Sequence, residues 1–438
     1  MRLLFVNSRP PWPPRRGDQA RTAGWIDRLR ERHAIEVVAQ SWPGFVAAPP
    51  PPGVIGTVVE VGRPALAGRL LQQCLDIGIG DEVRPLQAAL HDQARFHAAV
   101  QERVRRFRPH LAIVVLSRLG DVLPHLVRAG GGRLPRIIDL VDALSLNMRR
   151  RARREPALAP LWRHEAQRLA RWDVAVASLA DRALVVAERD RRAVLDAAEE
   201  ASALAHRLEV VPFGLEIDAG DPLEAKERDL VVLTGNLGYF PTVEGARWFA
   251  RAVWPRVRQR RPQARWLLAG ARPSPALRAL AGTEGIELEA EPPNLRAVLR
   301  RASVAVAPLR AGSGTPIKIL EAMAEGVPMV ATPSAVEGLD GWRRDDDEVP
   351  LLAVERDADA FAAAVSSLLE DRSRAWETAR AARRWLRSRH GLDASARHLE
   401  RLCEQVLQEQ VESRSSGEHG LRRRALDGSA IPGPPRAG

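Results

Sequence analysis

Residues 304–332, VAVAPLRAGSGTPIKILEAMAEGVPMVAT, decide the fold of this chain. They begin with a short apolar run, residues 304–309, which is followed by a glycine-containing loop. Thr315 and Pro316 are then typical of an N-cap and a first helical residue. A buried strand that leads through a glycine loop into a helix predicts one unit of a parallel α/β sheet.

The charge of Lys318 indicates what this loop does. The pattern places Lys318 at the third helical position, where a cation opposes the helix macrodipole at a cost of about 0.3–1 kcal/mol. An acid at that position would instead complete a capping box. The lysine fits there if an anion binds at the helix N-terminus, beside the flexible backbone of Gly312 and Gly314. The stretch therefore predicts an anion site.

Composition gives a weaker indication of the partner. The chain has 66 lysines and arginines, of which only Lys226 and Lys318 are lysine. Abundant Arg, Ala, Pro and Gly suggest a coding bias, so the net charge of +11 does not by itself indicate a nucleic-acid partner. No basic stripe interleaved with aromatic residues is present, and we expect no nucleic-acid binding. A basic surface would still attract nucleotides or anionic membranes.

Length and cysteine content bound the class of protein. A chain of 438 residues is long enough for two large domains or three small ones. Cys74 and Cys403 lie far apart and match no metal spacing, which fits a reducing compartment. The first residues, MRLLFVNSRPPWPP, are too short an apolar run for a signal sequence, and no segment approaches the roughly 18 apolar residues of a spanning helix. We expect a cytoplasmic protein without a bound metal.

Short apolar runs alternate with amphipathic stretches along the chain, which predicts parallel strands joined by helices. The polar segment 214–228 is the expected domain boundary, and residues 411–438, which lack periodicity, are expected to be a disordered tail. The expected strands are residues 2–7, 35–40, 54–61, 111–116, 136–141, 183–187 and 208–212 in the first half, and 229–234, 265–270, 286–290, 304–309, 328–332 and 351–354 in the second.

Glycine loops follow the first expected strand of each half. The loop SRPPWPPRRGDQAR brings Gly17 to the start of a helix, and the loop GNLGYFPTVEGARWF places Gly235 and Gly238 before another. A glycine before a helix is usually turn chemistry. Doubly wound sheets, however, bind ligands at the carboxyl ends of their strands. Together with the loop at Gly312, these segments predict a ligand cleft between two such sheets.

These segments give the chain a resemblance to a known family, the retaining GT-B nucleotide-sugar glycosyltransferases of the family 4 type. Among these it resembles the sugar transferases of exopolysaccharide and PEP-CTERM systems. The resemblance covers about residues 1–410. It is carried by PLRAGSGTPIKILEAMAEGVPMVAT with VEGLDG, by GNLGYFPTVEGARWF and by PPWPPRRGDQAR, and more weakly by IIDLVDALS and VVPFGLEID.

The resemblance implies an α/β GT-B fold of two Rossmann-like, doubly wound domains that face each other across a cleft. Residues 1–218 would form the acceptor domain, and residues 219–392 would form the nucleotide-sugar donor domain. A C-terminal helix, residues 393–410, would cross back to the first domain. The implied activity is transfer of a sugar from a nucleotide-diphosphate sugar to an acceptor hydroxyl, with retained configuration and without metal or cofactor. The acceptor would be a glycan or a lipid-linked compound.

Donor-site residues follow from the same resemblance. Glu321 is the second acid of a Glu-x7-Glu pattern and would accept hydrogen bonds from the ribose hydroxyls. Ser313 stands in place of the first acid, so it can hydrogen-bond a sugar or phosphate oxygen but carries no charge. Lys318 and the helix start at Thr315 would neutralise the leaving diphosphate.

Two further parts of the donor site are the Gly312–Gly314 loop and the loop after residues 229–234. Many relatives hold the diphosphate with an arginine and a lysine in the second of these loops. Here that loop has Gly235 and Asn236 and no cation before Arg247.

In the first domain, the family pattern places the Gly17 loop beside the diphosphate and the acceptor. Asp18 and Arg21 are therefore expected there, although an acid at a helix start is also a normal cap. Asp142, which follows an expected strand, is a further acceptor-site residue. Where many relatives have a catalytic histidine, this chain has Ser117 and Arg118. None of its ten histidines matches a motif, so no general base is predicted.

Several alternatives remain open. Glu321 and Lys318 could be only a surface pair on a helix, and Tyr239 with Phe240 is expected to pack against its helix rather than to stack on a base. The second function class is a GT-B nucleotide-sugar epimerase, and a nucleic-acid-binding protein is the third. The arginines of residues 149–154, in MRRRARREP, form either a solvated helix face or a contact with an anionic membrane. No hydrophobic anchor is evident beside them, so any attachment would be peripheral.

Overall fold

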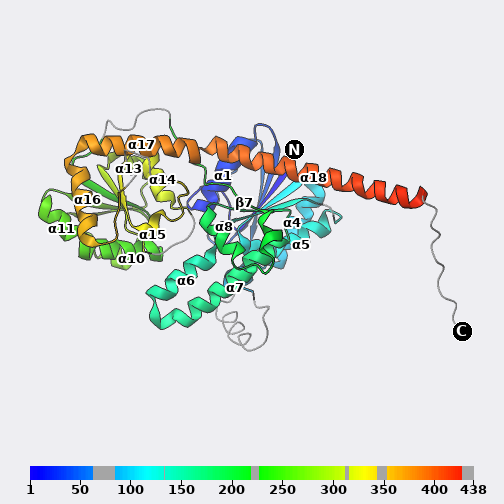
Figure 1. Cartoon of the computed structure of the whole chain (residues 1–438), viewed down its shortest axis with the longest axis horizontal. Coiled ribbons are helices and arrows are strands. Elements are labelled where there is room, and N and C mark those ends of the chain that lie inside the picture. Colours follow the sequence, from blue (N-terminus) through cyan, green and yellow to red (C-terminus); the bar gives the residue numbers. More distant parts are fainter. Residues whose placement is uncertain (63–83, 133, 219–225, 311–314, 343–352, 427–438) are drawn as a thin grey trace.

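The computed structural model describes residues 1–62, 84–132, 134–218, 226–310, 315–342 and 353–426. It shows two parallel sheets, each with helices on both faces (Figure 1). Every expected strand is present, with bounds shifted by a few residues at most. The prediction of two doubly wound α/β domains is therefore confirmed.

The first sheet has seven strands in the order β3-β2-β1-β4-β5-β6-β7, and each hydrogen-bonded neighbour is parallel. The strand order reverses between β1 and β4, and such a switch point is where an open α/β sheet binds ligands. The strands are β1 (Arg2–Asn7), β2 (Ala34–Ser41), β3 (Val54–Glu60), β4 (Leu111–Val115), β5 (Arg136–Val141), β6 (Arg182–Val185) and β7 (Leu208–Val210).

Helices cover both faces of this sheet because its central strands are apolar on both sides. One face packs against α1 (Gly17–Leu29) and the C-terminal helix α18 (Leu392–Leu426). The other packs mainly against α4 (Ala94–Phe107), α5 (Val122–Ala129), α7 (Ala159–Ser178) and α8 (Glu188–Leu195), with α9 (Ala201–Ala205) at its edge. Two further helices, α3 (Leu86–His91) and α6 (Leu144–Arg154), lie outside these layers.

The second sheet repeats the design with six parallel strands in the order β10-β9-β8-β11-β12-β13, and its switch point lies between β8 and β11. Its strands are β8 (Leu230–Asn236), β9 (Arg265–Ala271), β10 (Ile286–Ala290), β11 (Val304–Ala307), β12 (Met329–Ala331) and β13 (Ala353–Val354). One face packs on α10 (Phe240–Trp248), α11 (Trp254–Arg260) and α16 (Ala358–Glu370), and the other on α13 (Leu295–Arg301), α14 (Ile317–Ala324) and α17 (Arg372–His390).

The chain passes between the domains twice, and the two passages run side by side. The Leu215 amide donates to the His390 carbonyl (2.8 Å), and the Leu392 amide donates to the Leu215 carbonyl (3.1 Å). Val211 belongs to the core of the first domain, whereas Phe213 already belongs to the core of the second. The change of domain therefore falls near residue 212, a few residues before the expected boundary at 218.

Helix α18 crosses back over the first domain as expected, with Ala396, Leu399 and Val406 buried against it. The helix runs on to Leu426, well past the expected end at residue 410, and projects from the domain (Figure 1). The sequence beyond 411 lacks apolar periodicity, which is why a helix was not expected there. Residues 427–438 of the predicted tail lie outside the described residues.

No helix in the described part of the chain is both long enough and apolar enough to span a membrane.

Candidate functional site

The two switch points face each other across a narrow gap between the domains. Gly17, the first residue of α1, lies against Ile317, the first residue of α14. A Cβ atom on Gly17 would lie 2.4 Å from Ile317 Cδ1, so this position has little room for any other residue. Gly17, predicted as a site residue, therefore lets the two helix N-termini approach each other.

The loop after β8 is shaped by close backbone packing. Gly235 has φ of +123°, and a Cβ atom on neighbouring Gly270 would lie only 1.8 Å from the Gly235 carbonyl oxygen. Asn236 Oδ1 accepts a hydrogen bond from the Gly238 amide at 3.0 Å. The predicted donor residue Asn236 thus uses its carbonyl oxygen to fix the loop.

Helix α14 begins one residue later than expected. Pro316 is the N-cap, Ile317 is the first helical residue, and Lys318 is therefore the second rather than the third. The Lys318 amine reaches the first turn of α10 and the end of β8: it donates to Thr242 Oγ1 (3.2 Å) and lies 3.5 Å from the position that a Cβ atom on Gly235 would take. A single cation from α14 thus lies against both the end of β8 and the first turn of α10.

Burial shifts the pKa values of both Lys318 and Glu321. It lowers the pKa of Lys318 to about 8, with the charge of Glu321 opposing the change. It also raises the pKa of Glu321 to about 7, with Lys318 and Arg296 opposing. Both side chains are only partly accessible, and the lysine donates to Thr242. These features fit a ligand site better than a solvated surface pair, because perturbed ionisable groups cluster at functional sites.

Thr315 adds a second indication of a ligand site. Its Oγ1 atom is buried and has no hydrogen-bond partner among the described residues. Buried hydroxyl groups are almost always hydrogen-bonded in native proteins. Gly312, Ser313 and Gly314, which complete the predicted anion loop, lie outside the described residues.

Arg21 requires a correction, because it lies inside the first domain instead of in the cleft. Its side chain and that of Asp139 are both 0% exposed, and Arg21 Nε donates to Asp139 Oδ2 at 2.8 Å. A second donor, Nη1, reaches the Pro212 carbonyl at 3.1 Å. Arg21 follows Gly17 by one helical turn on the face that packs on the sheet, so its function is structural. It does not belong to the candidate site.

Asp18 and Asp142 remain near the cleft. Asp18 pairs with Arg9 at 3.4 Å, from the loop after β1. Asp142 follows Val141, which has φ of +68°. Asp142 also lies close enough to Tyr239 of the second domain for its charge to act on the tyrosine hydroxyl. Burial raises the pKa of Tyr239 to about 12, and the charge of Asp142 adds to the rise. Asp142 therefore lies close to the loop that opens α10.

Tyr239 also differs from expectation, since it does not simply pack against its own helix. It is 43% exposed, and its hydroxyl accepts a hydrogen bond from Asn147 of α6 at 2.8 Å. The guanidinium of Arg151, also from α6, lies over the ring of the adjacent Phe240, 5.3 Å from the ring centroid. Helix α6 thus ties the first domain to the donor-side loop.

Further cations that were not predicted as site residues lie near the cleft. Arg16 precedes Gly17, Arg118 follows β4, and Arg272 follows β9. Arg16 is close enough to Arg9 and Arg272 for their charges to lower its pKa to about 10, a shift due mainly to burial. The available signal was position: each residue directly follows a strand or precedes a helix at the cleft edge. The backbone of Arg272 lies against the loop after β8, since a Cβ atom on Gly238 would be 2.7 Å from the Arg272 carbonyl oxygen.

One histidine also approaches this region. His91 is 8% exposed, and its Nδ1 atom bonds the Gln40 side-chain oxygen at 2.6 Å. Burial lowers the pKa of His91 to about 3, and the charges of Arg118 and Arg9 contribute. His91 is therefore neutral at physiological pH, and it belongs to a helix that the family pattern did not mark.

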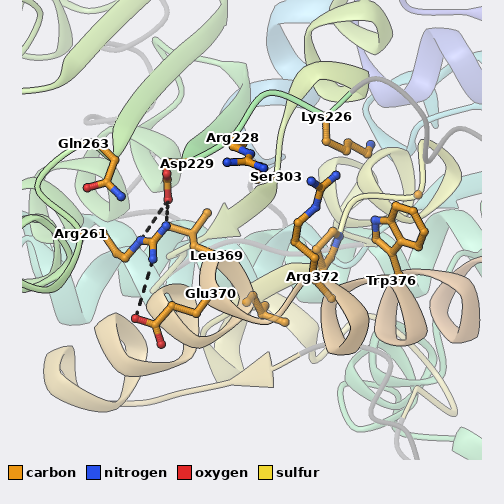
Figure 2. Close-up of a pocket in the computed structure, with 14 residues that line it drawn as sticks. Lys226, Arg228, Asp229, Arg261, Gln263, Ser303, Leu369, Glu370, Arg372 and Trp376 are labelled. Atoms are coloured by element: carbon orange, nitrogen blue, oxygen red, sulfur yellow. Dashed lines mark hydrogen bonds and ion pairs between the residues drawn. The ribbon is translucent and has the colours of Figure 1, made fainter.

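A separate cavity of about 330 Å³ lies at the opposite end of the second sheet (Figure 2). It is lined by Asp229, Ser303 and Pro328, which directly precede strands β8, β11 and β12. Arg261 crosses part of it, paired with Asp229 at 2.7 Å and with Glu370 at 4.0 Å. Because open α/β sheets bind ligands at their carboxyl ends, we do not assign the candidate site to this cavity.

No group of three or more His, Cys, Asp or Glu side chains in the described part of the chain could hold a metal ion. Independence of a metal remains a prediction.

Comparisons with known proteins agree with this architecture. HepE of Anabaena, solved with UDP and glucose, has a TM-score of 0.63 at 14% identity, covering 92% of this chain and 99% of HepE. Sucrose-phosphate synthase of Thermosynechococcus elongatus has a TM-score of 0.64 at 15% identity, covering 93% and 100%. A TarM variant of S. aureus, solved with UDP among its ligands, has a TM-score of 0.64 at 9% identity, covering 92% and 100%.

The fold is therefore that of the two-domain GT-B glycosyltransferases. Residues 228–371 match the family described as glycosyl transferases group 1, so the second domain carries a glycosyl transferases group 1 domain. No curated protein matches the chain by sequence. The matched segment contains both donor-side loops, Lys318 and Glu321.

Proposed function

We propose that this protein is a retaining glycosyltransferase that moves a sugar from a nucleotide-diphosphate sugar to an acceptor hydroxyl. The observation that carries the proposal is the position of Lys318, at the start of α14, whose amine donates to Thr242 of α10 and lies beside Gly235 at the end of β8. Glu321 follows one turn later on the same helix. A cation beside open helix amides suits a diphosphate, and a carboxylate beyond it suits ribose hydroxyls.

The chemistry follows from this arrangement. The bond between the sugar C1 and the donor phosphate oxygen breaks, a bond forms between C1 and the acceptor oxygen on the same face, and the acceptor proton passes to the leaving phosphate. Negative charge grows on the diphosphate as the bond breaks. Lys318 and the first amides of α14 would then stabilise the transition state more than the bound substrate. No protein side chain is required as general base.

The test is a donor screen that measures release of nucleoside diphosphate, followed by NMR assignment of the product anomer. Release from one donor, dependent on an added hydroxyl acceptor and with retained configuration, supports the proposal. Donor interconversion to an epimer without acceptor consumption would assign the site to the epimerase alternative. No turnover with any donor, together with no nucleotide binding, would reject both.

The acceptor is proposed to belong to exopolysaccharide or another cell-surface glycan, assembled on the cytoplasmic face of a membrane. The supporting feature is a helical hairpin formed by α6 and α7 (Figure 1). Its tip exposes Leu158 (47%) and Leu161 (51%). Three exposed arginines flank these leucines, namely Arg153, Arg154 and Arg163. We call these five residues the hairpin tip.

The structure corrects two expectations about this segment. Apolar side chains do lie beside the arginines, since Leu158 and Leu161 are exposed, and we propose that they enter the membrane interface. Two of the clustered arginines are engaged elsewhere: Arg150 pairs with Glu337 of the second domain, and Arg151 pairs with Glu155 at 2.9 Å. A membrane test must therefore avoid these two residues, because changing them would disturb contacts within the protein.

We expect the double change Arg153→Gln and Arg154→Gln to weaken binding to vesicles containing phosphatidylglycerol by about thirtyfold, because each arginine contributes about 1 kcal/mol near an anionic surface. Leu158→Ser should weaken it further at high salt, where charge is screened. The measurement is vesicle co-sedimentation. A matched control, Arg192→Gln with Arg207→Gln on the same domain, should bind like the wild type. Equal binding by all variants, or none by the wild type at low salt, would contradict the proposal.

A further inference from the structure

A cluster of arginines lies on the first-domain side of the cleft, beyond the residues assigned to the donor. Arg9 lies in the loop after β1, Arg16 caps the N-terminus of α1, and Arg118 lies in the turn after β4. Strands β1 and β4 are hydrogen-bonded neighbours at the switch point, so their carboxyl ends lie together. We call Arg9, Arg16 and Arg118 the arginine cluster.

Arg118 is the unusual member. Its Nε atom is buried and makes no hydrogen bond to any described residue. Burial and the charge of Arg9 lower the pKa of Arg118 to about 10, while Asp18 and Asp142 oppose the change. A buried guanidinium donor without an acceptor is costly, because removing a charged donor from water requires a partner. The guanidinium is therefore placed to receive an anion.

Two non-glycine residues near Arg118 have positive φ angles. Leu116 has φ of +78° and Val141 has φ of +68°, and both lie at carboxyl ends of neighbouring strands. Such conformations are strained for non-glycine residues and cluster at functional sites. They set the positions of the turn that carries Arg118 and of Asp142, which follows Val141.

Charge decides what kind of anion fits. The charged groups close to Arg16 and Arg118, counted together with these two residues, are four arginines and two aspartates: Arg9, Arg16, Arg118, Arg272, Asp18 and Asp142. The balance of four positive and two negative charges is +2. A phosphate group carries about −1.5 to −2 charges at neutral pH and matches the guanidinium fork, whereas a carboxylate would neutralise only half of this excess.

We propose, on the premise that the chain is the glycosyltransferase argued above, that the arginine cluster binds a phosphate group of the acceptor. The acceptor is then a hydroxyl compound that bears phosphate, either a soluble sugar phosphate or a lipid-linked sugar diphosphate. The phosphate stays intact during transfer and serves to orient the hydroxyl. An epimerase would have no use for such a second anion site.

The experiment uses the full chain saturated with UDP, so that the donor site is filled. Glucose 6-phosphate and a short-chain prenyl diphosphate are titrated separately, with glucose and glucuronate as neutral and carboxylate controls. We expect at least one phosphate compound to bind, and Arg118→Gln or Arg9→Gln to weaken that binding by about ten- to a hundredfold while UDP affinity changes less than twofold. The compound that binds more tightly identifies the soluble or the lipid source.

Controls keep the outcomes separate. Arg118→Lys retains the charge and should recover part of the affinity, and Arg192→Gln should behave like the wild type. Arg16→Gln tests the N-cap member, whose side chain makes no capping hydrogen bond, so its loss does not threaten folding. Equal binding of glucose or glucuronate, or loss of UDP affinity in place of phosphate affinity, would overturn the proposal. If neither UDP nor any other nucleoside diphosphate binds, the proposed function fails, and phosphate titration of the free protein still decides whether the cluster is an anion site.

Discussion

Replacing Lys318 by Met should reduce sugar transfer by about a hundred- to a thousandfold in kcat, the cost of removing one preorganised donor from a developing negative charge. Among the described residues, the lysine amine donates a hydrogen bond to Thr242 Oγ1, so the substitution removes one weak contact within the protein. Affinity for the bare nucleoside should change little, because the lysine faces the phosphates. Steady-state kinetics with the identified donor measure the effect.

The chain offers a matched control in its other lysine. Lys226 is also partly buried and donates to the Glu325 carbonyl at 3.0 Å, but it lines the cavity at the opposite end of the sheet. Lys226→Met should leave turnover unchanged. The unfolding midpoint of Lys318→Met should stay the same or rise, since a cation is removed from the first turn of α14. A fully active but less stable Lys318→Met protein would show that the lysine is structural.

Replacing Asp139 by Ala should lower the free energy of unfolding of the first domain by about 3–5 kcal/mol, the usual cost of leaving one member of a buried ion pair alone. Asp139 lies on β5, and its carboxylate also accepts from the Val141 amide at 3.3 Å. Arg21 would be left buried without its partner. Denaturant unfolding followed by tryptophan fluorescence measures the change, with Trp25 stacked on Arg21 at 4.0 Å as a local reporter.

An exposed ion pair between α1 and α18 provides the comparison. Arg28 of α1 bonds Asp393 of α18 at 2.6 Å, with side chains 32% and 63% exposed, so Asp393→Ala should cost no more than about 1 kcal/mol. The double change Arg21→Met with Asp139→Leu should recover much of the lost stability, because no charge is left buried. A similar small cost for both aspartates would contradict a buried, structural Arg21.

Most of the fold was predictable, because strand and helix periodicity is a local property. All expected strands appear in the structure, and the glycine loops that precede α1 and α10 lie at the switch points, as parallel topology requires. The crossing of α18 back to the first domain followed from family resemblance rather than from its periodicity. Its extension to Leu426 did not follow, since the sequence there has no apolar face.

The site was only partly predictable, because its remaining parts depend on distant partners. Arg21 was placed in the cleft from its position after Gly17, but its orientation is set by Asp139, which lies 118 residues away. Arg118 and Arg272 carry no motif, and only the sheet topology brings them to one edge. The perturbed pKa values of Lys318 and Glu321 likewise arise from burial, which sequence spacing does not reveal.

The central claim is that Lys318 and Glu321 bind the diphosphate and ribose of a nucleotide donor, and UDP titration calorimetry from pH 6 to 9 tests it most directly. Glu321, with a pKa of about 7, must be ionised to accept from the ribose, so affinity should fall as pH drops below 7. Lys318, with a pKa of about 8, must be protonated, so affinity should fall as pH rises above 8.

A plot of UDP affinity against pH should therefore be bell-shaped. In the complex, bound UDP favours ionised Glu321 and protonated Lys318, which widens the pH range of tight binding. Glu321→Gln should abolish the acidic limb, and Lys318→Met should abolish the basic limb, each with about ten- to a hundredfold weaker binding near pH 7.5. UDP binding that is absent, or that is equally tight in the wild type and both variants across this range, would contradict the account.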